Sequence, residues 1–328
     1  MLSPLKLAAG QAWAAWRRYP SLRRELAGAR PGPPILVTGM YRTGTTWVGA
    51  MLAPAGLWHL HEPFNPNQGL WHDELPYARA DVALPAVDDF VAGLLRGQHR
   101  AMLRLPNARR WFTPLRLLPH EPRRVLLKDP SAALLSEYLA NRHGMHALIL
   151  FRHPAAVVGS FLRLGWPTGA LVERLLASGA LMDDWLRPVE SSMGNAIGRR
   201  DAFSGAVLYA CVARVLLGFS RRNPESMIPV SFEDLCEDPI ARFRTLFEEL
   251  DLPYTERVRA VHDRLSAGGA DGSVERPHGV VRPTASMARR WKSEVADSDL
   301  TIVRDVWEQF DLPLYRTHAD WQRARNAE

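Results

Sequence analysis

The chain has 328 residues, of which 47% are hydrophobic and 23% charged. This composition is close to the average of globular domains, which excludes a disordered, collagen-like or low-complexity protein. The net charge is +6, but residues 1–34 hold six cations and one carboxylate and contribute +5 of it, so a basic surface for nucleic acid is excluded.

Residues 1–34 predict a basic helical arm, which ends in the proline-rich segment 31–34. We expect this helix to pack on the rest of the protein with its arginines in water. The alternative is peripheral contact of residues 1–30 with a membrane, because tryptophans and arginines are typical of interfacial helices.

The chain has no uncharged apolar run of about 18 residues, so no membrane span is predicted. Its two cysteines, Cys211 and Cys236, are too few for a disulfide framework and indicate a reducing compartment. We therefore expect a cytoplasmic protein. The frequent use of Arg, Ala, Pro and Leu suggests a bacterial source.

Short apolar runs alternate with helical periodicity through most of the chain. The predicted strands are 35–37, 57–60, 124–128, 147–151 and 227–232. The main predicted helices are 45–52, 87–103, 132–142, 154–164, 239–250 and 298–310. Because the strands are apolar rather than alternating, they predict an α/β fold with a central parallel sheet flanked by helices.

The domain organisation follows from the same pattern. Residues 35–328 are expected to form a single domain, with helical insertions near 71–122 and 166–200. Residues 266–283 are rich in Gly, Pro and Ser and predict a loop.

The segment 39–46 (GMYRTGTT) follows the first predicted strand and opens a helix. Its glycine spacing is that of a phosphate-binding P-loop, with Thr45 in place of the usual lysine. Converging backbone N–H groups and the helix dipole predict an oxyanion site there. Arg42 supplies a cation. Three hydroxyls can donate to the same anion, those of Thr43, Thr45 and Thr46.

A second anion site is indicated at Arg152 and Ser160. Arg152 follows the strand 147–151, and Ser160 lies two helical turns further on, in the helix that Pro154 opens. Lys128, at the end of its predicted strand, likewise stands where a P-loop triphosphatase would place a carboxylate for magnesium. Both observations favour anion binding without a metal.

Four ordered segments resemble the sulfotransferases that use 3′-phosphoadenosine 5′-phosphosulfate (PAPS). Residues 38–47 resemble their 5′-phosphosulfate loop, and residues 152–160 their 3′-phosphate motif. Residues 229–235 resemble a strand-to-helix segment of the family. Residues 126–130 resemble the lysine-bearing strand of its bacterial and Golgi-type branches, which include carbohydrate and tyrosylprotein sulfotransferases. The resemblance implies a P-loop NTPase-like three-layer fold and metal-free, in-line transfer of a sulfuryl group to a hydroxyl.

The resemblance also implies residue roles. Arg42 and Lys128 would stabilise the leaving phosphate, and Arg152 and Ser160 would bind the 3′-phosphate. The other residues implied at the nucleotide are Thr43, Gly44, Thr45, Thr46 and Trp47, the last against adenine.

The catalytic base implied by the resemblance is Glu62, which matches a glutamate of the carbohydrate and tyrosine branches. The histidine of the small-molecule branch is replaced here by Pro130. His61 and Asp129 are the alternative bases.

The basic segment that closes over the nucleotide in this family departs from its usual pattern here. Trp291-Lys292 is present without the preceding Arg-Lys-Gly. The candidates in its place are Arg282, Ser286, Arg289 and Arg290, of which we select Arg282 and Arg290.

The acceptor is expected to be a small molecule with a hydroxyl group, either a saccharide or a secondary metabolite. Two other functions remain open from the sequence. A P-loop kinase is disfavoured by the missing lysine. A non-catalytic nucleotide-binding protein of the same fold would retain the anion sites without turnover.

Overall fold

The computed structural model describes residues 31–68, 70–97, 100–104, 110–114, 124–266 and 284–322. Residues 1–30 of the predicted arm 1–34 and the candidate Arg282 lie outside the described residues.

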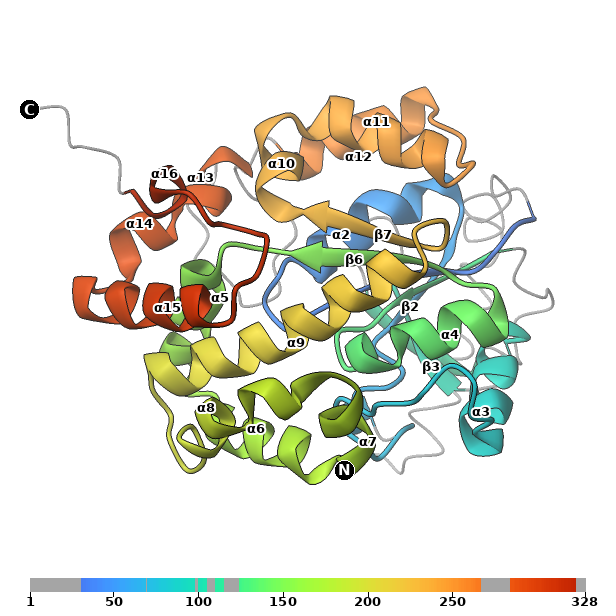
Figure 1. The fold of residues 1–328 in the computed structure, drawn as a ribbon. Helices are drawn as coiled ribbons and strands as arrows, with labels where there is room; N and C mark the ends of the chain where they lie inside the picture. The colour runs from blue at the N-terminus through green and yellow to red at the C-terminus, as the bar shows by residue number, and fades with distance from the viewer. Residues whose placement is uncertain are drawn as a thin grey trace, which may run out of the picture.

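One sheet with the strand order β4-β3-β2-β5-β1-β6-β7 runs through the molecule (Figure 1). The five neighbours from β2 to β7 are all parallel, whereas β3 and β4 pair antiparallel at one edge. The strands are β1 (Ile35–Gly39), β2 (Trp58–His61), β3 (Arg100–Arg104), β4 (Arg110–Pro114), β5 (Val125–Lys128), β6 (His146–Phe151) and β7 (Met227–Ser231). The predicted parallel sheet is confirmed.

Successive residues of the central strands point to opposite faces of the sheet and so build two cores. In β1, Leu36 belongs to one core and Ile35 and Val37 to the other. This is why the strands are apolar throughout, and why helices cover both faces. The P-loop NTPase-like three-layer fold is confirmed.

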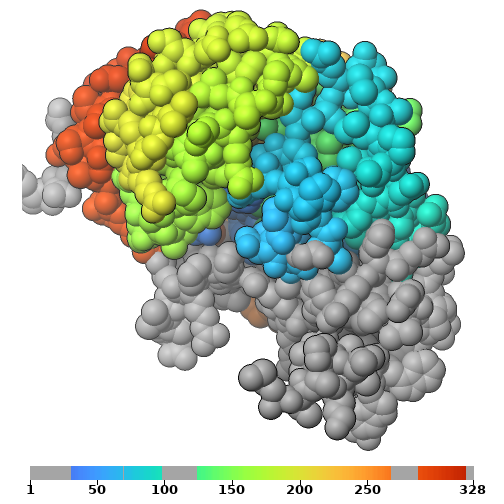
Figure 2. Space-filling model, turned by 90° about the horizontal axis from the view of Figure 1, so that it is seen from below, coloured from blue at the N-terminus to red at the C-terminus, as the bar shows by residue number. Residues whose placement is uncertain are grey.

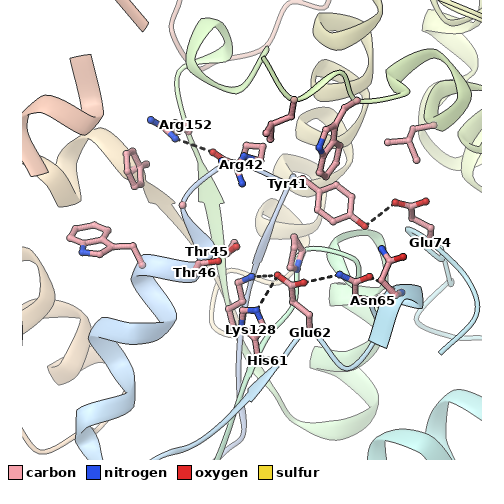
Figure 3. A pocket seen from close by; sticks show the side chains of 18 of the residues that line it. Tyr41, Arg42, Thr45, Thr46, His61, Glu62, Asn65, Glu74, Lys128 and Arg152 are labelled. Carbon is pink, nitrogen blue, oxygen red and sulfur yellow. Dashed lines mark hydrogen bonds and ion pairs between the residues drawn. The ribbon is translucent and has the colours of Figure 1, made fainter. Parts of the chain in front are cut away.

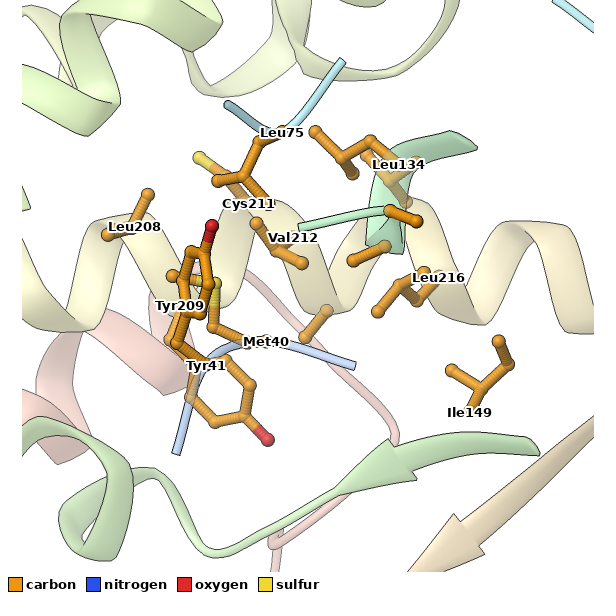
Figure 4. Packing of buried hydrophobic residues seen from close by; sticks show 14 of the residues in the cluster. Met40, Tyr41, Leu75, Leu134, Ile149, Leu208, Tyr209, Cys211, Val212 and Leu216 are labelled. Carbon is orange, nitrogen blue, oxygen red and sulfur yellow. The ribbon is translucent and has the colours of Figure 1, made fainter. Parts of the chain in front are cut away.

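The larger core lies under α9 (Ala202–Arg222), which crosses this face of the sheet (Figures 1 and 4). Asp201 caps the helix by accepting a hydrogen bond from the backbone N–H of Ser204. The other helices on this face are α3 (Pro85–Leu95), α4 (Ser136–His143), α5 (Pro154–Leu164), α6 (Thr168–Ala177), α7 (Gly179–Leu181), α8 (Glu190–Gly194), α14 (Trp291–Glu294), α15 (Asp297–Gln309) and α16 (His318–Trp321).

Within the described ranges, α9 is the one helix that by itself has the length and mean hydropathy of a membrane-crossing segment. However, 78% of its apolar window is buried inside the protein, where it packs against α5, α6 and α15. Its hydrophobicity is therefore explained by its place in the core.

The second core lies on the opposite face, under α2 (Thr45–Leu52) and α11 (Pro239–Glu249). The other helices that contribute to it are α10 (Phe232–Glu237), α12 (Glu256–Ser266) and α13 (Thr284–Arg289). Cys236 belongs to this core and Cys211 to the other, and both are free thiols.

The predicted helical insertion near 71–122 is only partly helical. Helix α3 ends at Leu95, because Gly97 takes up a left-handed conformation with φ 68°. The predicted continuation of this helix to residue 103 is wrong, since β3 and β4 follow. The region 166–200 is built mainly of helical segments.

Candidate active site

The carboxyl ends of the parallel strands lie on the same side of the sheet, and the residues near these ends line a cavity of about 580 Å³ (Figure 3). Arg42 follows β1, Glu62 follows β2 and Arg152 follows β6. Lys128 is the last residue of β5, and Phe232 directly follows β7. A crevice beyond the carboxyl ends of parallel strands is the usual ligand site of open α/β sheets.

The loop between β1 and α2 forms a tight turn that lines this cavity. Arg42 and Gly44 have left-handed backbones, with φ 74° and 102°. A Cβ atom on Gly44 would lie 2.4 Å from the ring of Phe232, so the loop requires glycine there for both its conformation and its space. The loop thus leads into the N-terminus of α2, as an anion-binding loop should.

The three threonines of this loop differ in their placement. Thr45 and Thr46 line the cavity. Thr43 is fully buried, and its hydroxyl donates to the backbone carbonyl of Met40 at 2.7 Å. The expected role of the Thr43 hydroxyl at the anion therefore lacks geometric support, because it stabilises the turn instead.

The two predicted anion sites are joined. Arg42 Nε donates to Ser160 Oγ at 2.8 Å. Arg152 Nη1 donates to the backbone carbonyl of Arg42 at 3.1 Å, and its Nη2 donates to that of Met287 at 2.9 Å. The Arg152 guanidinium lies 4.4 Å from the centre of the Phe232 ring. The contacts join residues that follow the neighbouring strands β1 and β6.

One end of the cavity is lined by Trp47, Arg152 and Phe232. Two buried N–H groups at this end have no hydrogen-bond partner within the described part of the chain. They are Arg152 Nε and Trp47 Nε1. Trp47 packs edge-on against Phe232 and Phe243, with ring centroids 5.8 and 5.3 Å away. Because an unsatisfied buried donor is costly, these two groups indicate that a ligand accepts hydrogen bonds here.

The centre of the cavity holds an ion pair between Lys128 and Glu62. The Lys128 side chain is 2% exposed and that of Glu62 13%. Asn65 Nδ2 donates to Glu62 Oε2 at 2.7 Å, and His61 Nε2 lies 3.7 Å from Glu62 Oε1. The backbone N–H of Glu62 donates to the Lys128 carbonyl at 2.8 Å, which extends the β2–β5 pairing by one residue.

Of the alternative bases, Asp129 is fully buried and does not line the cavity. Its Oδ2 accepts from the Phe64 N–H at 2.6 Å and its Oδ1 from the Ser131 N–H at 2.9 Å. Burial raises the pKa of Asp129 to about 7. Asp129 therefore holds the loop that carries Glu62, whereas His61 and Glu62 both face the cavity.

Three cavity residues were given no role from the sequence: Tyr41, Asn65 and Glu74. The Tyr41 hydroxyl donates to Glu74 Oε1 at 3.4 Å and lies 2.9 Å from Ser131 Oγ. Trp166 packs edge-on against Tyr41 at 4.9 Å. Asn65 and Glu74 come from loop segments without periodicity, so their position could not be inferred from the sequence alone.

The predicted closing segment is only partly present in the cavity. Met287 lines it, whereas Arg290 pairs with Glu294 and is not among the described residues of the cavity wall. The His153 ring stacks on Trp291 at 4.0 Å and so holds the start of α14 against α5. No group of three His, Cys, Asp or Glu side chains that could hold a metal ion occurs within the described ranges. The expected metal independence remains a prediction.

The fold and the loop after β1 define an α/β protein with a P-loop-like anion site. Residues 33–256 match the profile of the sulfotransferase family, and the chain belongs to this family. The expected enzyme class is therefore confirmed: the reaction is sulfuryl transfer.

Solved structures with a similar fold include three sulfotransferases. The sulfotransferase domain of the Synechococcus PCC 7002 olefin synthase is 19% identical, with 88% of this chain and 98% of that chain covered and a TM-score of 0.43. Mouse sulfotransferase SULT7A1, complexed with PAP, is 12% identical, with 88% of each chain covered and a TM-score of 0.45. STF9 from Mycobacterium avium is 17% identical, with 92% of this chain and 82% of that chain covered and a TM-score of 0.40. The comparison with curated proteins gave no match.

Proposed function

We propose that the chain transfers a sulfuryl group from PAPS to a hydroxyl of a small molecule without a metal ion. The observation that carries this proposal is the pair of buried donors at one end of the cavity that have no partner among the described residues, Arg152 Nε and Trp47 Nε1. The donor PAPS brings phosphate oxygens and a purine, both of which accept hydrogen bonds.

The residues present fit such a donor. Arg152 would bind its 3′-phosphate. Arg42 would face the 5′-phosphosulfate, together with the N-terminal end of α2 that Thr45 and Thr46 begin. Trp47 would lie against the adenine. PAPS would supply the sulfuryl group and a phosphate leaving group.

Two further residues of the cavity, Glu62 and Lys128, have proposed roles in the transfer step. Glu62 accepts the proton of the attacking hydroxyl, as a carboxylate paired with a cation stays ionised. Lys128 lies beside Glu62 and supplies positive charge where the leaving phosphate gains negative charge. No residue in this scheme needs to bind a metal.

We expect the Arg152→Ala variant to bind 3′,5′-adenosine bisphosphate (PAP) about 10- to 100-fold more weakly than the wild type, because it loses charge-assisted hydrogen bonds worth about 1.5–3 kcal/mol. Isothermal titration calorimetry in the presence of EDTA measures this. Arg187→Ala is the matched control, since Arg187 forms exposed ion pairs with Asp183 and Glu190 only at the surface. Preference of the wild type for ATP with Mg²⁺ over PAP would instead favour a kinase.

For the acceptor we propose a saccharide. The other end of the cavity has one apolar and one polar wall, and carbohydrates present both an apolar ring face and polar edges. The apolar wall consists of Leu164, Gly165, Trp166, Pro167 and Leu171. The polar wall consists of Asn65, Asn67, Gln68 and Glu74.

Figure 2 supports an opening at this end. It shows the green segment of α5 and α6 beside the lighter blue segment that follows β2, with darker blue atoms of the early chain visible in the hollow between them. We further propose that residues 35–328 act as one catalytic unit.

The cytoplasmic location expected from the sequence remains a prediction.

We expect Trp166→Ala to raise the KM for 4-nitrophenyl glycosides about 10-fold with little change in kcat, because Trp166 supplies apolar surface and takes no part in the chemistry. Initial rates of sulfation with a panel of neutral glycosides measure this, with Trp185→Ala as the control outside the cavity. Sulfation of 4-nitrophenol alone, with no glycoside accepted, would favour a phenolic metabolite as the acceptor.

A further inference from the structure

Asn65 is bonded to Glu62 through both its backbone and its side chain. The backbone N–H of Asn65 donates to the Glu62 carbonyl at 3.1 Å, which closes a turn over residues 62–65. Its side-chain Nδ2 donates to Glu62 Oε2 at 2.7 Å (Figure 3). No role was assigned to Asn65 from the sequence.

The orientation of the Asn65 amide is fixed by a third contact. The backbone N–H of Asn67 donates to Asn65 Oδ1 at 3.0 Å. A backbone N–H can only donate, so the oxygen of the amide faces Asn67 and its NH₂ group faces Glu62. The amide is thus held as a donor to the carboxylate.

The Glu62 backbone is also unusual, and its side chain is held from two sides. Glu62 has φ 55°, in the left-handed region that a glutamate rarely adopts. Its carboxylate is held at one oxygen by Lys128 and at the other by Asn65. Two donors on opposite oxygens restrict rotation of the carboxylate plane, which a single ion pair would leave open.

We propose that Asn65 is a positioning residue that orients the Glu62 carboxylate for accepting the proton of the acceptor hydroxyl. The inference rests on the proposed role of Glu62 as the base. A misplaced catalytic group can slow a reaction by about 100-fold. Asn65 therefore acts on turnover through Glu62, while the binding of the nucleotide depends on residues at the other end of the cavity.

The test measures single-turnover conversion of PAPS to PAP with water as the acceptor, alongside the Kd for PAP. We expect Asn65→Ala to slow conversion about 10- to 100-fold with the Kd unchanged. Asn65→Asp keeps the size and the oxygen that accepts from Asn67 but loses the donor, and it should slow conversion at least as much. Asn195→Ala is the control, because Asn195 is exposed and does not line the cavity, and it should remain close to the wild type.

A double variant separates positioning from a general structural effect. In the Glu62→Gln background, Asn65→Ala should cause little further loss, because a residue that acts through Glu62 has nothing left to position. A full additional loss in this background, or wild-type rates for Asn65→Asp, would overturn the inference. If Glu62→Gln itself retains the wild-type rate, the proposed role of Glu62 as the base is wrong, and the inference fails with it.

Discussion

The Glu62→Gln variant is expected to retain nucleotide binding and to lose most of its turnover. Loss of a general base slows a reaction by about 10²- to 10⁴-fold. Glutamine preserves the shape and still reaches Asn65, but it cannot take a proton from the acceptor. The Kd for PAP should change less than threefold, because Glu62 lies beside Lys128 and away from Arg152 (Figure 3). Measurements of kcat with PAPS and of PAP binding by calorimetry test both parts.

Glu74→Gln is the matched control for this variant, because it also removes a carboxylate from the cavity. The Glu74 side chain is 30% exposed, and its carboxylate contacts Tyr41 rather than Lys128. Its kcat should stay within a few-fold of the wild-type value. Should both variants lose activity equally, the loss would reflect the charge of the cavity and not a specific base.

The Lys128→Met variant is expected to show the second large loss, in both rate and stability. Lys128 is buried and forms an ion pair with Glu62. Methionine at this position would leave the Glu62 carboxylate poorly hydrated and without its lysine partner. Breaking a buried ion pair costs about 3–5 kcal/mol, and the partial exposure of Glu62 places the expected loss near the lower end. Removing a group that stabilises the leaving phosphate lowers kcat by about 10²- to 10³-fold.

Thermal unfolding and steady-state rates measure these two effects separately. Lys292→Met serves as the control, because Lys292 lies beside Trp291 outside the catalytic cavity. A Lys128→Met enzyme with wild-type turnover would show that Arg42 alone supplies the charge needed at the leaving group.

The sequence predicted the parallel core of the sheet well, because its strands are buried on both faces and appear as short apolar runs. The run 147–151 became β6 with its start shifted by one residue, and the helix 45–52 has the predicted bounds. The segment after Leu95 was predicted wrongly. Helical periodicity continued through it, but Gly97 ended the helix and the chain entered an antiparallel hairpin whose pairing is not encoded by local periodicity.

The candidate site was predictable where its residues follow strands, since parallel strands bring their carboxyl ends together. Arg42, Lys128 and Arg152 were found in this way. The contact of Arg42 with Ser160 could not be found, because the two were assigned to separate phosphates and their contact depends on the adjacency of β1 and β6. The direction of the Thr43 hydroxyl was equally hidden, since side-chain direction in a tight turn depends on backbone torsion angles that the residue type does not determine.

The two ends of the cavity come from different kinds of structure, and this has a consequence for engineering. The nucleotide end is built by strand termini locked into the sheet, where even a methyl group on Gly44 would collide with Phe232. The other end is built by the turn after β2 and by the corner between α5 and α6. Libraries that randomise the cavity-lining positions Asn67, Gln68, Leu164 and Trp166, none of which is buried, should therefore yield folded variants with new acceptor preferences, whereas substitutions in residues 39–44 should mostly yield inactive protein.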